Sequence, residues 1–261
     1  MARFACALIT GATSGIGTAF ARALDSGTDL LLTGRDGAKL AELARELVRP
    51  GRRVDSLAAD LATETGRAVA IEAALARPVD LLVNNAGLGR LGPLETNPAA
   101  TELEMAQVNV VAVVALTRAL LPGMIARAEA DGRRAGVIVV ASTAAFQPTP
   151  FLTTYGATKS FDLHFAEGLA SELRGRPVDV LALCPGATAT AFFARAGIPG
   201  DTLRRIAAPE RVAREALAAL GRKRVHVVGG INRLGAFLVR LAPRDVAADG
   251  AARLLRARLP R

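Results

Sequence analysis

The chain has 261 residues, of which 51% are hydrophobic and 4% aromatic, enough for one large α/β domain or two small ones with a mostly aliphatic core. Its net charge of +9 is uneven, because residues 222–261 carry ten basic and two acidic side chains (+8) and the preceding 221 residues balance at +1. The body of the chain is therefore not expected to bind nucleic acid. Two cysteines and two histidines without ligand-like spacing predict neither a disulfide framework nor a metal site.

Short apolar runs alternate with longer helical patterns along the chain. The runs are apolar throughout, which is typical of strands buried on both faces of a parallel sheet, and they lie at residues 4–10, 29–33, 54–59, 79–84, 136–142, 178–184 and 224–228. The helical patterns lie between them, at residues 16–26, 38–48, 62–76, 98–121, 154–174 and 209–220. This alternation predicts an α/β fold with a single-domain, Rossmann-type, doubly wound parallel sheet and helices on both faces.

We expect this domain to occupy residues 1–228, with a basic helical C-terminal extension, residues 229–261, packed on it. Two amphipathic helices are predicted in the extension, over residues 231–243 and 251–259. The longest uncharged run, residues 135–158, contains Pro148 and Pro150, which argue against a membrane-spanning helix. No targeting segment is recognised at the N-terminus, and a cytoplasmic location is expected.

A glycine-rich turn, TGATSGIG, follows the first predicted strand and opens the first helix. Gly11, Gly15 and Gly17 allow a sharp turn and a close approach to a ligand, and the helix N-terminus offers free N–H groups to a pyrophosphate. The spacing differs from the G-x-G-x-x-G fingerprint, and a tight turn without a ligand is the alternative. Its place between a strand and a helix favours a nucleotide.

The second predicted strand ends at Gly34, where NAD-binding folds usually place an acid for the ribose 2′-hydroxyl. Arg35 instead offers a cation for a 2′-phosphate, although an ordinary solvated arginine is the alternative. Asp36 is expected to cap the following helix rather than bind ribose. Asp60 also precedes a helix, where it is either a cap or a ligand-binding residue.

Two further polar positions interrupt apolar segments. The fourth predicted strand ends in NNAG, residues 84–87, where Asn84 can tie loops together and Ala86 and Gly87 leave room for a flat ligand. Asn109 lies within an apolar helical run. A buried amide needs hydrogen-bond partners, and a bond to a backbone carbonyl would satisfy it without any catalytic role.

Tyr155 is the only tyrosine, and Lys159, one of three lysines, follows it by four residues. Residues four apart share a helix face. A nearby ammonium favours the phenolate form of a tyrosine, so the pair indicates an acid/base group that works near neutral pH. Ser142 ends the fifth predicted strand, where ligands of such sheets gather. Its hydroxyl can bond a carbonyl oxygen or simply cap a turn.

Taken in order, TGATSGIG (10–17), Asp60, NNAG (84–87), Asn109, Ser142, YGATK (155–159) and PGATAT (185–190) give the chain its resemblance to the short-chain dehydrogenase/reductase family, from about residue 4 to residue 228. The resemblance implies that Tyr155 exchanges the proton, that Lys159 lowers the pKa of this tyrosine and binds the nicotinamide ribose, and that Ser142 orients the carbonyl. It also implies that Asn109 holds a water linking Lys159 to solvent.

The same resemblance implies a set of cofactor-binding residues. They are Gly11, Thr13, Ser14, Gly15, Ile16, Gly17, Arg35, Asp60, Leu61, Asn85, Ala86, Gly87, Tyr155, Lys159, Pro185, Gly186, Thr188 and Thr190. Many family members have Lys or Arg at the position of Ser14, so a preference for NADP depends here on Arg35. The extension is a second departure, since many members lack it.

The expected activity is NADPH-dependent reduction of a ketone or aldehyde, with NADP as the cofactor and NAD less favoured. An NAD-dependent alcohol dehydrogenase and a redox-inactive cofactor-binding scaffold are the alternatives. The expected substrate is an apolar carbonyl or alcohol compound, bound by Leu88, Leu91, Phe146, Phe151, Phe192 and Phe193. The resemblance implies a homodimer or homotetramer, and the basic tail leaves contact with a membrane surface as a weaker alternative.

Overall fold

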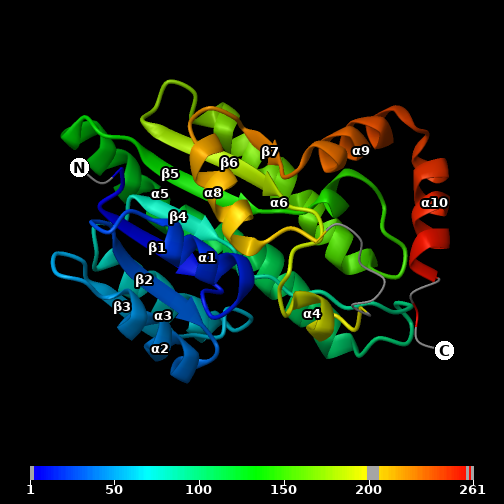
Figure 1. Ribbon diagram of the computed structural model, residues 1–261, viewed down its shortest axis with the longest axis horizontal. Helices are drawn as coiled ribbons and strands as arrows, with labels where there is room; N and C mark the ends of the chain where they lie inside the picture. The colour runs from blue at the N-terminus through cyan, green and yellow to red at the C-terminus, as the bar shows by residue number, and fades with distance from the viewer. Residues whose placement is uncertain (1–2, 199–205, 257–258, 260–261) are drawn as a thin grey trace.

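The computed structural model describes residues 3–198, 206–256 and 259. Its centre is one parallel seven-stranded sheet with the order β3-β2-β1-β4-β5-β6-β7 (Figure 1). The Rossmann-type sheet predicted from the sequence is confirmed. The strands are β1 (Cys6–Thr10), β2 (Asp29–Gly34), β3 (Val54–Ala58), β4 (Leu81–Asn84), β5 (Ala135–Val140), β6 (Val178–Cys184) and β7 (Val225–Val227).

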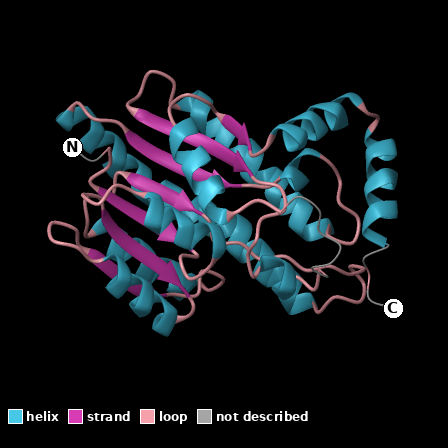
Figure 2. Ribbon diagram, viewed as in Figure 1, coloured by secondary structure: helices cyan, strands magenta, loops and turns pink. Residues whose placement is uncertain are grey.

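Helices cover both faces of the sheet (Figure 2). One face packs on α1, α2 and α8, through side chains such as Phe20, Leu40 and Val212. The other packs on α3, α5 and α6, through side chains such as Ala70, Leu116 and Leu163. The bounds of these helices are α1 (Gly15–Ala23), α2 (Gly37–Leu47), α3 (Glu64–Leu75), α5 (Ala112–Asp131), α6 (Thr153–Glu172) and α8 (Pro209–Ala219).

The chain reverses its direction across the sheet at β1, which pairs with β2 on one side and β4 on the other. Ligands of open parallel sheets bind at the carboxyl ends of the strands beside such a switch point. The loops that follow β1, β4, β5 and β6 leave the sheet at this edge, and the glycine turn, NNAG, Ser142 and PGATAT lie where these strands end. Tyr155 and Lys159 lie on α6, whose first turns are at the same edge.

The predicted helix over residues 98–121 is three elements: α4 (Ala99–Ala106), a π-helical turn η1 (Gln107–Val111) and α5. The predicted end at residue 121 was wrong, since α5 continues past Pro122 to Asp131 and ends at Gly132, whose φ is +62°. The stretch Ala99–Asp131 is long and apolar enough to span a membrane. Core helices pass the same test, and this one buries Leu116, Leu120 and other side chains against the sheet.

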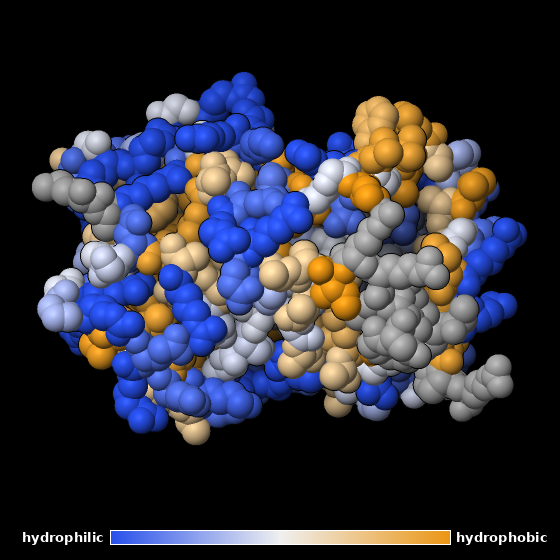
Figure 3. Space-filling view, in the orientation of Figure 1, coloured by the Kyte–Doolittle hydropathy of each residue, from blue (hydrophilic) through white to orange (hydrophobic). Residues whose placement is uncertain are grey.

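The extension begins after β7 and forms α9 (Gly230–Leu241) and α10 (Arg244–Arg256). The predicted start of the second tail helix at residue 251 was seven residues late, because α10 begins directly after Pro243. Residues 257–258 of that predicted helix lie outside the described residues. α9 exposes an apolar stripe, formed by Ile231, Leu234, Phe237, Leu238 and Leu241. Hydrophobic surface is visible over this helix at the upper right of Figure 3.

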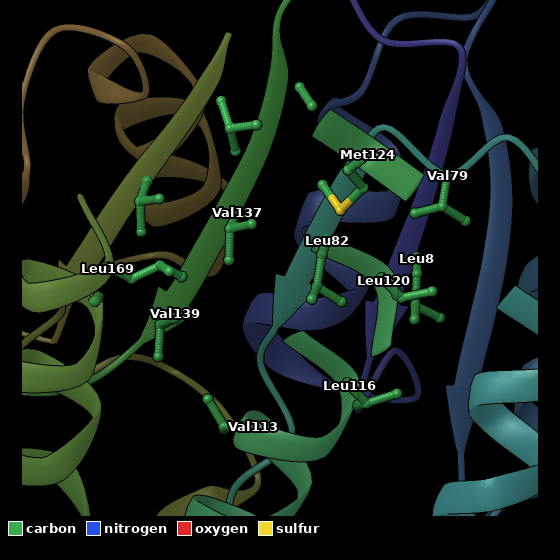
Figure 4. Close-up of a cluster of buried hydrophobic side chains, with 14 of the residues drawn as sticks. Leu8, Val79, Leu82, Val113, Leu116, Leu120, Met124, Val137, Val139 and Leu169 are labelled. Atoms are coloured by element: carbon green, nitrogen blue, oxygen red, sulfur yellow. The ribbon is translucent and has the colours of Figure 1, made fainter. Parts of the chain in front are cut away.

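One buried cluster joins β1 and β4 to α5. Leu116, Leu120 and Met124 point from the helix toward Leu82 and Leu8 of the sheet (Figure 4). All five side chains are at most 2% exposed. Packing at this point fixes α5 on the sheet and therefore fixes the position of η1 before it.

We expect Leu82→Ala to lower the free energy of unfolding by about 2–5 kcal/mol, because it leaves a cavity in the core. Leu75→Ala is the matched control, since Leu75 is 57% exposed and surface changes usually stay within about 0.5 kcal/mol. Denaturant unfolding of both variants measures the difference. Equal losses would contradict the assignment of Leu82 to the core.

Candidate active site

A cavity of about 740 Å³ opens at the carboxyl edge of the sheet. Ser142, Tyr155 and Lys159 line it together with all the predicted cofactor-binding residues except Gly17. Asn109 is the one predicted catalytic residue outside its lining. Segments far apart in the sequence therefore meet at one site, as the motif order predicts.

The glycine turn brings the ends of β1 and β4 into contact. Gly11 has a φ of +64°, a conformation that favours glycine. A Cβ atom on Gly17 would lie 2.3 Å from the Gly11 carbonyl oxygen and 2.6 Å from Nδ2 of Asn85. Gly17 thus leaves room for the turn to fold back on the helix, which explains why it does not itself face the cavity.

Thr10 and Asn85 join the turn to β4. The hydroxyl oxygen of Thr10 accepts hydrogen bonds from the backbone N–H groups of Asn85 and Ala86, both at 2.9 Å. The Asn85 side chain donates to the Thr10 carbonyl oxygen at 2.8 Å. The sequence interpretation gave this role to Asn84, which instead donates to the Thr117 hydroxyl of α5 at 3.0 Å, and it missed the role of Thr10. Its signal was a hydroxyl at the end of an otherwise apolar strand.

Arg35 lines the cavity and also pairs with Glu104, with 2.7 Å between Nη1 and Oε1. Asp36 caps α2 by accepting from the Lys39 backbone N–H, as predicted, and the side chains of these two residues form an ion pair. Bonds to Lys39 hold the pKa of Asp36 below its ordinary value. Lys39 lines the same end of the cavity and was missed in the sequence interpretation.

Asp60 is not the cap of the following helix. Thr63 has that role, with its hydroxyl oxygen accepting from the Gly66 N–H at 3.0 Å. Asp60 instead accepts from the Ala62 N–H at 3.0 Å and lines the cavity. The loop after β3 is thereby folded toward the site.

The loop after β6 lies across the N-terminus of α1. A Cβ atom on Gly15 would lie 2.4 Å from the methyl carbon of Thr190, so the loop approaches the glycine turn closely. Arg195 of the short helix α7 (Phe192–Arg195) donates a hydrogen bond to the Ser14 hydroxyl at 2.9 Å. A cation is therefore present beside Ser14, although it comes from a segment 181 residues away.

Tyr155 faces an aromatic side chain of the same loop. Its ring centroid lies 5.2 Å from that of Phe192. A Cβ atom on Gly89 would lie 2.5 Å from the Phe192 ring and 3.3 Å from the Tyr155 ring, so the glycine allows the two rings to approach. Ser142 accepts from the Ala144 N–H at 3.1 Å and lines the cavity. It caps a turn and faces the site at the same time.

Lys159 is buried beneath the tyrosine. Its ammonium donates to the Val140 carbonyl oxygen at 2.7 Å and to Oδ2 of Asp162 at 2.9 Å. Burial by itself lowers the pKa of Lys159, but the charge of Asp162 and the nearby Tyr155 outweigh it and raise the pKa above the ordinary value. Lys159 is therefore an ammonium at neutral pH. Asp162 was not recognised in the sequence.

Asn109 lies in η1 and is fully buried. Its side-chain oxygen accepts from the Leu88 N–H at 2.8 Å, and its nitrogen donates to the Leu88 carbonyl and the Thr158 hydroxyl, each at 2.9 Å. The amide thus holds the loop after β4 against α6. The water-holding role that the resemblance implies stays a prediction.

The cavity beside Tyr155 is apolar. Of the predicted substrate-binding residues, Leu88, Phe192 and Phe193 line it. Leu91 and Phe151 lie behind this wall in a cluster that also contains Leu255 of α10. Phe146 does not line the cavity, because its ring lies under the Arg240 guanidinium of α9, 4.9 Å from the centroid.

A dinucleotide fits this arrangement. The glycine turn leaves a side-chain-free surface at the N-terminus of α1, which suits a pyrophosphate. A Cβ atom on Gly87 would lie 3.4 Å from Nζ of Lys159, so the glycine leaves the ammonium accessible to a ribose. Tyr155 and Ser142 lie along the same cavity.

Comparison with protein families agrees with this site, since the family model for short chain dehydrogenases matches residues 5–197. The chain belongs to the short-chain dehydrogenase/reductase family. It is accordingly an NAD(P)-dependent oxidoreductase that acts on hydroxyl or carbonyl groups.

Relatives in the family come from distant organisms. Short chain dehydrogenase MYCFIDRAFT_6125 of Pseudocercospora fijiensis is 36% identical over 203 residues, which cover 76% of this chain and 62% of the relative. The chain thus spans less than two thirds of that protein. Dehydrogenase/reductase SDR family member 7B of Bos taurus is 32% identical over 260 residues, covering 92% of this chain and 78% of the relative.

Solved structures show the same fold with either nucleotide. A 7beta-hydroxysteroid dehydrogenase superposes with a TM-score of 0.85 at 25% identity, covering 97% of this chain and 100% of the other. A short-chain dehydrogenase from Sphingobium yanoikuyae in complex with NADPH gives 0.76 at 30% identity (98% and 96%). A family member from Burkholderia phymatum in complex with NAD gives 0.78 at 25% identity (91% and 94%).

We expect Gly17→Ala to weaken dinucleotide binding roughly ten- to a hundredfold, because overpacking costs about 1–3 kcal/mol and here pushes on the turn itself. Gly168→Ala is the matched control, since Gly168 lies within α6 and its added Cβ would meet nothing within 4 Å. Titration calorimetry measures both affinities. Unchanged binding by the Gly17 variant would contradict the proposed turn geometry.

Proposed function

We propose that this enzyme reduces apolar ketones or aldehydes with NADPH. The observation that carries the proposal is the placement of Tyr155, Lys159 and Ser142 along one cavity whose far wall is apolar. A binding scaffold needs no acid beside a buried cation, so this arrangement favours catalysis over a redox-inactive role.

Side chains of the protein donate the proton that the reduction needs and orient the substrate. NADPH supplies the hydride to the carbonyl carbon when it is bound. The Ser142 hydroxyl donates a hydrogen bond to the carbonyl oxygen, and the Tyr155 hydroxyl donates its proton to that oxygen, giving the alcohol. The Lys159 ammonium stabilises the phenolate that remains. The Phe192 ring packs against the Tyr155 ring and limits its movement.

Arg35 supports the choice of NADPH. Its pair with Glu104 is exposed, with side chains 53% and 32% accessible, and pairs of this kind contribute only about 0–1 kcal/mol. A 2′-phosphate can therefore replace Glu104 and bind the guanidinium through two charged hydrogen bonds. Asp36 also lines the cavity, but its carboxylate caps α2 and pairs with the Lys39 ammonium, which compensates its negative charge.

Two further cations strengthen this preference. Lys39 and Arg195 line the cavity together with Arg35. Arg195 lies against Ser14, the position at which many family members carry a basic residue. The positive charge expected there is thus supplied from α7.

The apolar lining supports a hydrophobic substrate. Leu152, Phe192, Phe193 and Ile198 line the cavity and belong to one apolar cluster with the Tyr155 ring. A similar structure is a hydroxysteroid dehydrogenase, which agrees with a bulky apolar compound. Specificity depends on the site rather than on the fold, so a panel of apolar ketones and aldehydes is the appropriate first screen.

Oxidation of an alcohol with NAD is the second candidate. The pair between Arg35 and Glu104 favours it, because an arginine that stays bound to a carboxylate does not recognise a 2′-phosphate. The similar Burkholderia phymatum protein was solved with NAD. The two candidates differ in the response of Arg35 to substitution.

Tyr155→Phe is expected to lose about 10²–10⁴-fold in turnover, since it removes the proton donor. The fold and the affinity for the dinucleotide should be retained, because the ring and its contact with Phe192 remain. Steady-state reduction of a good substrate, together with calorimetric cofactor binding, checks both expectations. Turnover within a few-fold of wild type would exclude Tyr155 as the acid.

Arg35→Ala is expected to reduce kcat/KM for NADPH roughly ten- to a hundredfold, since a charged hydrogen bond contributes about 1.5–3 kcal/mol. The value for NADH should stay nearly constant. Arg45→Ala is the control, because Arg45 lies on the exposed side of α2 and, among the residues that the structure describes, donates to the Ala41 carbonyl of its own helix. Equal losses with both cofactors would remove Arg35 from the phosphate site and favour the NAD-linked candidate.

A further inference from the structure

We propose that Asp162 is a positioning residue of the active site, which keeps Lys159 charged and aimed at Tyr155; the inference deepens the proposed function and rests on it. Tyr155, Lys159 and Asp162 occupy positions i, i+4 and i+7 of α6, which share one face of a helix. They lie at increasing depth, from the cavity to the interior of the protein.

The contact between the two charged groups is short and buried. Nζ of Lys159 lies 2.9 Å from Oδ2 of Asp162, and the side chains are 6% and 2% exposed. A second N–H of the ammonium donates to the Val140 carbonyl at the end of β5. An ammonium has three donors, so one N–H is left for the cavity. The two internal bonds fix its direction.

Burying the Asp162 carboxylate at this position costs free energy, which indicates a role beyond packing. No described residue hydrogen-bonds its second oxygen, Oδ1, although that atom is buried. Burial raises the pKa of Asp162, and the charge and hydrogen bond of Lys159 oppose this. An apolar side chain would pack here without the cost of desolvating a charge.

Among the groups near Lys159, Asp162 is the one that supplies a negative charge to the ammonium. Tyr155 lies one helical turn before Lys159 on α6. Cys184 lies at the end of β6, the strand against which α6 packs. Burial raises the pKa of the Cys184 thiol to about 12, so the thiol carries no charge near neutral pH. Glu167 and Arg240 act on that thiol with opposite charges.

Removal of the carboxylate has two opposing effects on Tyr155, and we expect the effect through Lys159 to be the larger because Asp162 contacts the ammonium directly. A buried lysine without a counter-charge loses its proton more readily, because desolvation disfavours the ammonium. A neutral amine does not stabilise a phenolate. Without Asp162, Tyr155 should keep its proton to a higher pH, although a direct effect of the missing negative charge on the phenol would act the other way.

The composition of the chain allows a direct measurement. Tyr155 is the only tyrosine and there is no tryptophan, so the ultraviolet absorption of tyrosinate in the purified full-length enzyme reports this residue alone. The titration needs no substrate or cofactor. We would record it for wild type, Asp162→Asn, Lys159→Met and the double variant, which together form a double-mutant cycle.

We expect Asp162→Asn to raise the pH midpoint of the tyrosine titration by about one unit or more. In the Lys159→Met background the same change should lower the midpoint or leave it constant, because only the direct repulsion is then removed. Asp179→Asn is the matched control. Asp179 is likewise a buried carboxylate paired with a basic side chain, 2.6 Å from Arg134, but it lies at the start of β6, far from Cys184 at its end. It should leave the midpoint unchanged.

A midpoint that falls or stays constant in Asp162→Asn would overturn the proposal, and so would an equal rise in both backgrounds. Far-ultraviolet circular dichroism confirms that each variant is folded. Asp162→Ser, which removes the charge and keeps an acceptor, replaces the asparagine variant if that one does not fold. Failure of the carbonyl-reductase assignment would leave the titration unaffected, so the two hypotheses are tested separately.

Discussion

The junction between the ends of β1 and β4 is the constraint on which the site depends. The order of strands reverses here, and Thr10 and Asn85 close the junction through hydrogen bonds between the turn and the neighbouring strand. Gly17 lets the helix start close behind it. The surface for the dinucleotide is therefore made by the backbone. The side chains that follow the later strands are positioned relative to this junction.

A second set of interactions holds the catalytic helix. Asn109 connects the loop after β4 to Thr158, and Lys159 connects α6 to the end of β5. Both residues are buried and hydrogen-bonded to more than one partner, which gives the helix a single position relative to the sheet. This matters chemically, because a small displacement of the proton donor has a large effect on rate.

Local patterns in the sequence were sufficient to predict the sheet and its ligand-binding edge, and the resemblance to the family supplied most of the residues that line the cavity. Apolar runs define parallel strands, and glycines or polar residues at strand ends mark the loops beyond them. Asp162 could have been found from its place seven residues after Tyr155 on a buried helix face. Arg195 could not, since its contact with Ser14 joins segments that only the folded chain brings together. The π-helical turn at η1 has no simple pattern and was missed for that reason.

The extension meets the catalytic domain mainly on the substrate side, although Asn232 of α9 also lies against Gly186 in the wall of the cavity. Arg240 stacks on Phe146, and Leu255 joins the apolar cluster behind Phe192. The glycine turn and the cations near the nucleotide belong to other segments. Changes in α10 can therefore alter which compounds enter while the nucleotide site is left unchanged, so that substrate range and coenzyme use are free to evolve separately in this architecture.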